Sequence, residues 1–208
     1  MTDTPDAPQQ HYFTPRPDSA SAPRQINATV RGFKLTLWTD RGVFSYGSVD
    51  RATKLLAETM QLPERGDILD WGAGYGVLSI VAALACPQCR VTMVEVNERA
   101  AALAQQNLEA AKLTNAVVIT GEAPGVLGDS QYDAIISNPP LHVGKAAVEA
   151  VIFEAGKRLR PGGQLWLVVP TQKGAKGFLK LMQVTFEHAE TVTIDGGFRI
   201  LRAQQASN

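Results

Sequence analysis

The sequence predicts an α/β fold with a mostly parallel sheet, an antiparallel final edge strand and a small β extension at the N-terminus. From about residue 67, short apolar runs alternate with segments of helical periodicity, which is typical of parallel strands joined by helices. The last two runs are separated by Asp195-Gly196-Gly197, a hairpin signal that makes the final strand antiparallel. Because only one core pattern is present, we expect a single domain over 24–208.

The beginning of the chain predicts a tail, a hairpin and a helix. Residues 1–23 are rich in Pro, Ser, Asp and Gln and poor in apolar residues, which predicts a flexible tail. Two alternating runs flank Arg31-Gly32 and predict a hairpin extension over 24–47, with a third short strand at 43–47. Asp50 then stands where a helix N-cap is expected.

The remaining elements follow from hydrophobic periodicity. Short apolar runs predict strands at 68–71, 90–95, 116–119, 132–137, 164–169, 189–194 and 198–203. Apolar residues three and four positions apart predict helices at 77–85, 97–111, 146–159 and 174–183. Parallel strands of this kind place their carboxyl ends along one edge of the sheet, where ligands bind in such folds.

Composition is that of an ordinary globular protein, with 45% hydrophobic and 19% charged residues. No apolar run approaches the roughly 20 residues that a membrane helix needs. The first ten residues lack the basic and apolar regions of a signal peptide. We therefore expect a cytoplasmic protein without a membrane partner, while the oligomeric state stays open.

Positive charge gathers toward the C-terminus although the formal net charge is zero. Residues 145–208 contain nine Lys or Arg against five Asp or Glu, an excess of +4. This excess suits a phosphate-bearing partner, and it equally fits ordinary solvated helix faces. The candidate phosphate contacts are Lys145, Lys173, Lys176, Lys180, Arg199 and Arg202.

The two cysteines form one CxxC motif, Cys86-Pro-Gln-Cys89. Such a motif is either a redox pair or half of a zinc site. A structural zinc site needs four ligands, and the sequence has no second CxxC and only three scattered histidines. We expect two reduced thiols in a loop and no metal site.

The strongest motif is Asp70-x-Gly72-Ala73-Gly74-x-Gly76, between a predicted strand and a predicted helix. Glycines here permit unusual backbone angles and a close approach to a ligand, and the helix start favours a carboxylate or phosphate. Glu95 ends the next strand and can accept both hydroxyls of an unphosphorylated ribose, while Asp70 can sit near a cationic amine. A ligand with an amine, a carboxylate and a bare ribose fits S-adenosylmethionine (SAM) better than NAD.

A second motif, Ser137-Asn138-Pro139-Pro140-Leu141, ends the fourth strand of the sheet and faces the same crevice. The two prolines restrict the backbone and hold the Asn138 carboxamide rigidly. The Asn138 side-chain oxygen and the Pro139 carbonyl could accept the two hydrogens of an aromatic amine. These contacts favour the pyramidal nitrogen that attacks a methyl donor. A strand-terminating turn is the structural alternative.

Together these motifs resemble the small-domain methyltransferases that modify guanine N2 in small-subunit ribosomal RNA. The resemblance covers nearly the whole chain from about Val43. It rests on Asp50 and on segments 42–45, 53–56, 70–79, 96–100, 137–145 and 161–166.

The resemblance implies a Rossmann-like class I methyltransferase fold, SAM as methyl donor, RNA as substrate, and Asn138 and Pro139 at the acceptor amine. It places Glu122 near the adenine and Thr53 with Phe44-Ser45 in a lid over the cofactor. The expected cofactor-binding residues are thus Thr53, Asp70, Gly72, Ala73, Gly74, Gly76, Glu95, Val96, Glu122 and Asn138. The expected acceptor-binding residues are Pro140, Leu141 and His142.

The chain departs from the family pattern in three respects. Leu141 stands where an aromatic residue often follows Asn-Pro-Pro and would stack on the target base. Glu95 stands where Asp is common. Many members carry a second, inactive copy of the domain that helps to bind RNA, for which 208 residues leave no room. RNA contacts would then come from residues 11–50, the basic C-terminal face or a second subunit.

Two alternatives stay open at this point. The same motif could orient an adenine amine in nucleic acid or a glutamine side chain in a protein. Alternatively, the chain could be a non-catalytic RNA-binding or partner-binding protein that keeps the fold. Intact glycines and Asn138 favour catalysis.

Overall fold

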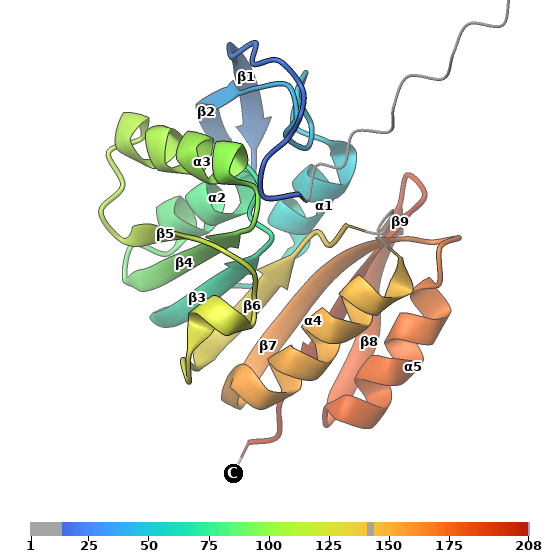
Figure 1. Ribbon diagram of the computed structural model, residues 1–208. Helices are drawn as coiled ribbons and strands as arrows, with labels where there is room; N and C mark the ends of the chain where they lie inside the picture. The colour runs from blue at the N-terminus through green and yellow to red at the C-terminus, as the bar shows by residue number, and fades with distance from the viewer. Residues whose placement is uncertain (1–13, 141–143, 208) are drawn as a thin grey trace, which may run out of the picture.

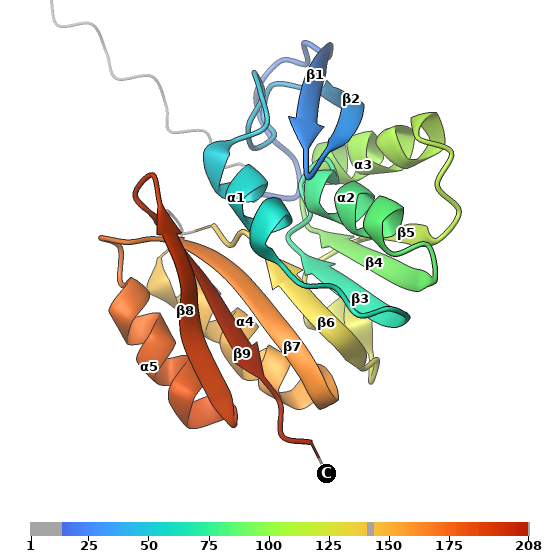
Figure 2. The same cartoon turned by 180° about the vertical axis from the view of Figure 1, so that it is seen from behind.

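The computed structural model describes residues 14–140 and 144–207 and shows a seven-stranded sheet with helices on both faces (Figures 1 and 2). The strand order is β5-β4-β3-β6-β7-β9-β8. The strands are β3 (Gly66–Trp71), β4 (Cys89–Glu95), β5 (Ala116–Thr120), β6 (Tyr132–Ser137), β7 (Leu159–Pro170), β8 (His188–Asp195) and β9 (Phe198–Gln204). The neighbouring strands from β5 through β4, β3 and β6 to β7 pair in parallel. Strand β9 pairs antiparallel with both β7 and β8. The predicted α/β class and antiparallel closing hairpin are confirmed.

Two apolar cores flank the sheet because successive strand residues point to opposite faces. Ile68, Ile136 and Trp166 face the core beneath α1 (Arg51–Thr59), α2 (Val77–Ala85) and α3 (Glu98–Ala110). Their neighbours Leu69 and Ile135 face the second core, covered by α4 (Lys145–Arg158) and α5 (Ala175–Thr185). A 3₁₀ turn, η1 (Gly125–Leu127), adds Leu127 to that core. None of the described helices is both long and apolar enough to cross a membrane.

The predicted hairpin is present as β1 (Arg24–Val30) and β2 (Phe33–Thr39). Its turn has positive φ at both Arg31 and Gly32, the geometry that suits tight hairpins. The predicted third strand at 43–47 is wrong, since the segment forms turns and bends. Positive φ at Gly42 and Ser45 takes the backbone out of the extended region there.

Residues 14–23 run along α3 and the loop after β2. The Pro15 carbonyl accepts from Glu98 N at 2.9 Å, and Ser21 Oγ donates to Asp40 at 2.5 Å. Arg99 donates to the Ser19 carbonyl at 3.0 Å. The flexible tail predicted over 1–23 stays a prediction, because residues 1–13 lie outside the described part of the chain.

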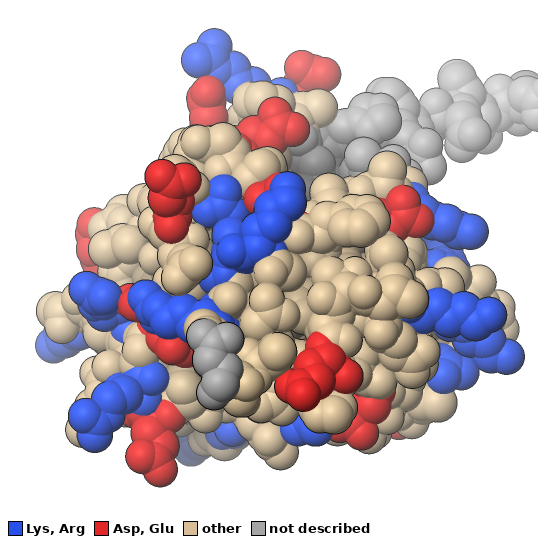
Figure 3. All heavy atoms as spheres, turned by 90° about the horizontal axis from the view of Figure 1, so that it is seen from below, with Lys and Arg blue, Asp and Glu red and all other residues tan. Residues whose placement is uncertain are grey.

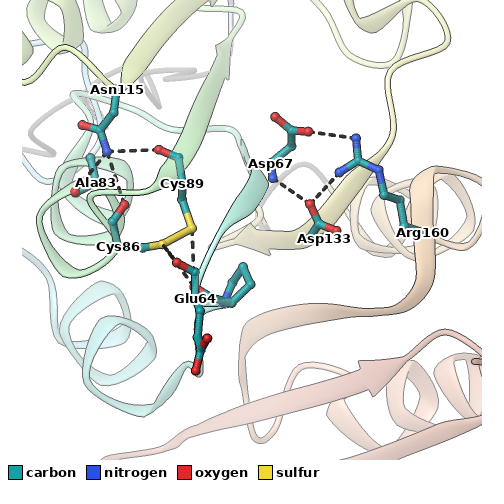
Figure 4. The surroundings of a disulfide bond; sticks show 9 residues. Glu64, Asp67, Ala83, Cys86, Cys89, Asn115, Asp133 and Arg160 are labelled. Atoms are coloured by element: carbon teal, nitrogen blue, oxygen red, sulfur yellow. Dashed lines mark hydrogen bonds and ion pairs between the residues drawn. A yellow bond between two sulfur atoms is a disulfide. The ribbon is translucent and has the colours of Figure 1, made fainter.

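The prediction of two reduced thiols is wrong, because Cys86 and Cys89 are joined by a disulfide (Figure 4). The chain turns back after α2, with Cys89 N donating to the Cys86 carbonyl, and this brings the two Cα atoms within 5.3 Å. The Asn115 amide nitrogen lies 3.1–3.3 Å from the carbonyl oxygens of Ala83, Cys86 and Cys89 and holds the loop closed. The disulfide lies at the end of the sheet opposite the glycine loop.

The predicted boundary between the fourth helix and its strand also differs. The α4 helix ends at Arg158 and β7 begins at once with Leu159, so that Pro161-Gly162-Gly163 lies within the strand. The pairing of β6 with β7 shifts register across this stretch, which accommodates the proline. Arg160 joins β7 to Asp67 of β3 and Asp133 of β6 by ion pairs of 2.8 and 2.5 Å (Figure 4).

One buried amide fastens the hairpin to the domain. Asn107 Oδ1 on α3 accepts from Trp38 N at 2.7 Å, while its Nδ2 donates to the carbonyls of Trp38 and Tyr75, both at 2.9 Å. Asn107 is 1% exposed, so these partners would have no water to replace it.

We expect Asn107→Ala to lower the free energy of unfolding by about 3 kcal/mol, because buried backbone groups lose their partners. Gln105→Ala is the matched control. Gln105 lies on the same helix and is exposed, and its side-chain NH2 donates to Glu109 of the same helix. Urea denaturation should show a change below about 0.5 kcal/mol for the control. Equal losses in the two variants would contradict the role of Asn107.

Candidate active site

The glycine loop between β3 and α2 is held at the carboxyl ends of the parallel strands. Gly72 N and Ala73 N both donate to the Val94 carbonyl of β4, at 2.9 and 3.1 Å. Gly74 N donates to Glu95 Oε2 at 2.8 Å. The loop is therefore fastened to the next strand by backbone donors, which fixes its shape before any ligand arrives.

The three glycines serve different purposes. All have positive φ, at 77° for Gly72, 58° for Gly74 and 95° for Gly76. A side chain at Gly76 would come within 3.4 Å of Ala104 and Met93, so this glycine allows α2 to pack. A side chain at Gly72 or Gly74 would meet no protein atom within 4 Å, so both open onto free space. The structure thus leaves a cradle that a ligand can enter.

Glu95 lies at the floor of this cradle. Its Oε1 accepts from Asn97 N and its Oε2 from Gly74 N, each at 2.8 Å, and its side chain is nearly buried. Burial raises the pKa of the Glu95 carboxyl despite these backbone donors. Each oxygen keeps a further lone pair, so the predicted contact with ribose hydroxyls stays compatible with the bonds already made.

A cavity of about 270 Å³ adjoins the loop beyond β4 and β5. It brings together five residues that the sequence predicts at the site, namely Gly72, Glu95, Val96, Glu122 and Pro140. Trp71, Ala123 and Val151 add apolar walls. An apolar cleft with carboxylates at one end suits a nucleoside whose ring is buried and whose hydroxyls are bonded.

A second cavity, of about 330 Å³, lies over the end of β6 and contains the predicted reaction centre. Asn138, Pro139 and Pro140 form one wall. The remaining lining residues come from distant segments: Phe44, Asp50, Ala52, Gly72, Pro170, Lys173 and Phe198. Gly72 lines both cavities, as does Pro140, so the two spaces meet at the glycine loop.

A narrow space of about 30 Å³ lies between the loop and the start of α1. Its lining includes Thr53 and Ser45 together with Gly72, Ala73 and Asn138. Thr53 and the 44–45 segment therefore lie beside the glycine loop, where the resemblance puts a lid. Asn97 Nδ2 holds this segment in place by donating to the Gly42 carbonyl at 3.0 Å.

The Asn138 carboxamide is held by α1 rather than by its own strand. Its Nδ2 donates to Thr53 Oγ1 at 3.0 Å, and the Thr53 hydroxyl in turn donates to the Asp50 carboxylate. Ser137 Oγ donates to the Trp71 carbonyl at 2.7 Å and fixes the end of β6 beside β3. Leu141 and His142, also expected at the acceptor, lie outside the described residues.

Asp70 lies beneath the loop and lines none of these three cavities. It is fully buried, and its Oδ2 accepts from Ser79 Oγ at 2.6 Å. Its Oδ1 has no hydrogen-bond partner among the described residues. Burial raises the pKa of the Asp70 carboxyl to about 7, the Ser79 hydrogen bond opposes this rise, and the nearby Glu95 carboxylate adds to it.

Phe198 was missed by sequence reasoning, and Lys173 was placed differently. Phe198 has no local signal of function, because it enters the site only through the β7–β9 pairing, in which it lies opposite Pro170. Lys173 was expected as a surface phosphate contact and lines the cavity beside Asn138. The hairpin at 195–197 is the sequence signal for Phe198, because the register of β9 on β7 brings it to the carboxyl edge.

The chain matches one family model and two kinds of relative, one matched over nearly its whole length and one over about half. The family model described as "Methyltransferase small domain" matches residues 34–202. "Uncharacterized protein YbxB" of Bacillus subtilis is 29% identical over 198 residues, covering 94% of this chain and 98% of that protein. "Ribosomal RNA small subunit methyltransferase C" of Pseudomonas putida is 36% identical over 169 residues, covering 78% of this chain and 49% of that protein.

A solved structure of an RNA methyltransferase is also similar to this chain. The "T. Thermophilus 16S rRNA N2 G1207 methyltransferase (RsmC) in complex with AdoMet and Guanosine" superposes with a TM-score of 0.79 at 31% identity. It matches over 89% of this chain and 51% of its own. The chain thus spans about half the length of the RNA methyltransferases it matches.

We expect Gly72→Ala to weaken SAM binding at least 10-fold, because the new methyl group would occupy the shared corner of the two cavities. Gly32→Ala is the matched control, since Gly32 also has a φ near 80° and open space around it, but lies in the hairpin turn. Both variants should lose about 1 kcal/mol of stability from the left-handed backbone. Calorimetric titration showing unchanged affinity for Gly72→Ala would contradict the loop assignment.

Asp70 should make stability fall as pH rises. Between its unfolded pKa of 3.8 and its folded pKa of about 7, the folded state holds a proton that the unfolded state releases. The free energy of unfolding therefore decreases across this window. From pH 5 to pH 8, the wild type should lose roughly 2–3 kcal/mol more than Asp70→Asn, which cannot ionise. Parallel pH profiles in denaturant titrations would reject the buried, protonated carboxyl.

Proposed function

The chain belongs to the methyltransferase small-domain family, and we propose that it transfers the methyl group of SAM to the exocyclic N2 amine of a guanine in small-subunit ribosomal RNA. The observation that carries the proposal is the junction at Gly72 and Pro140, where a cavity with nucleoside-binding chemistry meets the cavity that holds Asn138 and Pro139. A donor and an acceptor bound in these two spaces would meet at the end of β6.

The residues around the first cavity fit the chemistry of SAM. Glu95 and Glu122 offer acceptors to hydroxyl and amino groups, and the open cradle at Gly72 and Gly74 admits a ligand against the backbone. Asp70, expected near the cationic amine, is fully buried beneath the loop and supports the cradle from below. When bound, SAM supplies a methyl group activated by a positively charged sulfur.

The second cavity supplies what an aromatic amine needs as a nucleophile. The amine lone pair is delocalised into its ring, so attack requires the nitrogen to become pyramidal. Asn138 Oδ1 and the Pro139 carbonyl oxygen would accept the two amine hydrogens and stabilise the positive charge that develops on the nitrogen. The proton leaves after the methyl group is transferred, so the chain needs no base before attack.

The walls of this cavity favour a planar ring. Phe44 and Phe198 supply aromatic surfaces, and Pro139 and Pro170 add flat apolar ones. These rings can take the stacking role that Leu141 cannot fill as an aliphatic residue. Lys173 lies at the same cavity, where its ammonium group could contact a phosphate of the acceptor strand.

The choice of guanine in ribosomal RNA rests on the relatives. The structural neighbour is described as acting on the N2 group of a guanine and was solved with guanosine. Two alternatives share the same geometry, an adenine amine and a protein glutamine side chain. A non-catalytic SAM-fold protein that binds RNA is a third, and the intact Asn138–Thr53 contact argues against it.

RNA contact is expected near the acceptor cavity, which Lys173 lines. In the view of Figure 3, Lys and Arg side chains lie in separate groups interspersed with Asp and Glu. That face, with its mixed charges, offers only weak non-specific attraction for a polyanion. We propose that Lys173 and the neighbouring Lys176 guide the RNA, with a cytoplasmic location that suits this substrate.

The test is transfer of tritiated methyl groups from SAM to small-subunit particles from a strain that lacks the gene, followed by nucleoside analysis. N2-methylguanosine is expected. Methyladenosine or methylglutamine would move the proposal to one of the alternatives. SAM binding without transfer to RNA or protein would support a non-catalytic role.

We expect Asn138→Ala to lower kcat roughly 100-fold or more, the usual cost of removing a group that stabilises transition-state charge. SAM affinity should change little, because the main cofactor contacts come from the glycine loop and β4. Gln183→Ala, which removes an exposed carboxamide on α5, is the control and should retain wild-type turnover. Near-normal kcat in Asn138→Ala would exclude the proposed role of the carboxamide.

A further inference from the structure

We infer that Asp50 and Thr53 are positioning residues that fix which way the Asn138 carboxamide faces. The inference rests on the proposed function of Asn138. It assigns a purpose to a hydrogen-bonded chain that runs from the N-terminus of α1 to the end of β6. This purpose differs from the lid role that the resemblance gives to Thr53.

The hydrogen-bonded chain consists of three side chains in series. Asp50 Oδ1 caps α1 by accepting from Ala52 N at 2.9 Å and from Thr53 N at 3.1 Å. Asp50 Oδ2 accepts from the Thr53 hydroxyl. Thr53 Oγ1 accepts from Asn138 Nδ2 at 3.0 Å. Each link joins a group to the next one toward the reaction centre.

The charge of Asp50 sets the direction of every link. An ionised carboxylate has acceptors only, so the Thr53 hydroxyl must use its single hydrogen on Asp50. Its oxygen then faces Asn138 as an acceptor. The amide group that meets it must be the NH2, which leaves Asn138 Oδ1 on the other side of the carboxamide. That oxygen is the atom that an acceptor amine needs.

A carboxamide without this chain would have two nearly equivalent orientations, because its oxygen and NH2 group have similar shapes. In the flipped orientation the NH2 group would face the acceptor amine, and two donors would oppose each other. Only one orientation supports the reaction. Thr53 and Asp50 therefore act on the reaction through Asn138, without needing to touch the acceptor amine.

Packing of α1 keeps the three hydrogen-bonded side chains aligned. Thr53 is 7% exposed, and Leu56 and Ala57, on the following turn of the helix, are fully buried. The side of α1 that carries Thr53 packs against the sheet, so the hydroxyl keeps its position relative to β6. A merely structural role for these contacts would stabilise α1 and would leave the orientation of Asn138 unconstrained.

The first test does not require activity. In the ligand-free protein, nuclear magnetic resonance should show the Asn138 side-chain NH2 protected from exchange with water, its signal identified by its loss in Asn138→Ala. Protection should disappear in Thr53→Val and persist in Thr53→Ser, which keeps a hydroxyl. Rapid exchange in the wild type, or unchanged protection in Thr53→Val, would overturn the inference whether or not the chain methylates RNA.

The second test measures single-turnover methyl transfer to the small-subunit particles with enzyme in excess. At saturating SAM, Thr53→Val should lower the rate at least 10-fold, and Thr53→Ser should recover most of it. Asp50→Asn can still cap the helix but no longer fixes the direction of the links, so its rate should also fall. Thr185→Val, which removes a hydroxyl bonded to the Leu181 carbonyl on α5, is the control.

A double-mutant comparison separates positioning from loss of structure. If Thr53 acts through Asn138, Thr53→Val should cost nothing further in the Asn138→Ala background. Equal fold-losses in both backgrounds would show an independent effect and reject the inference. Inactivity of the wild type on these particles would count against the proposed function instead, and the exchange measurement would still decide the orientation.

Discussion

The functional end of this molecule depends on the hydrogen bonds that fasten the glycine loop to β4. Val94 and Glu95 accept three backbone donors from Gly72, Ala73 and Gly74, and these bonds hold the loop in a conformation that only glycines adopt without strain. Since the loop lies where two cavities meet, its shape sets the geometry of both. The parallel pairing of β3 with β4 and β6 then brings the loop, the acidic strand end and Asn138 to one edge.

This arrangement concentrates buried carboxyl groups behind the loop. Asp70 and Glu95 end neighbouring strands, and burial raises the pKa of both carboxyls. Each additional negative charge in such a place costs stability unless a cation or a hydrogen-bond donor balances it. Glu95 has backbone donors that include Gly74 N and Asn97 N, whereas Asp70 has Ser79 alone among the described residues. The unmet acceptor beneath the loop is thus a cost to folding.

Much of the fold could be predicted because strands and helices differ in hydrophobic period. The runs ending at Trp71, Glu95 and Ser137 identified three strand ends, and the parallel sheet then required them to be neighbours. The segment at 43–47 was predicted as a short strand, but positive φ at Gly42 and Ser45 takes its backbone out of the extended region. The disulfide and the place of Phe198 depend on how the chain returns on itself, which periodicity does not encode. The Thr53–Asn138 contact likewise joins residues 85 positions apart.

The identity of residue 50 shows how local folding and chemistry share one group. Ser, Thr, Asn and Asp all serve as helix N-caps, so capping α1 alone would not require a carboxylate. A carboxylate is required to fix the direction of the hydrogen bonds to Thr53 and Asn138, because a hydroxyl or an amide at residue 50 could both donate and accept. Asp50 meets both needs, with one oxygen on the helix and the other on Thr53. A change there would therefore separate two properties, because the helix could remain capped while the carboxamide lost its preferred face.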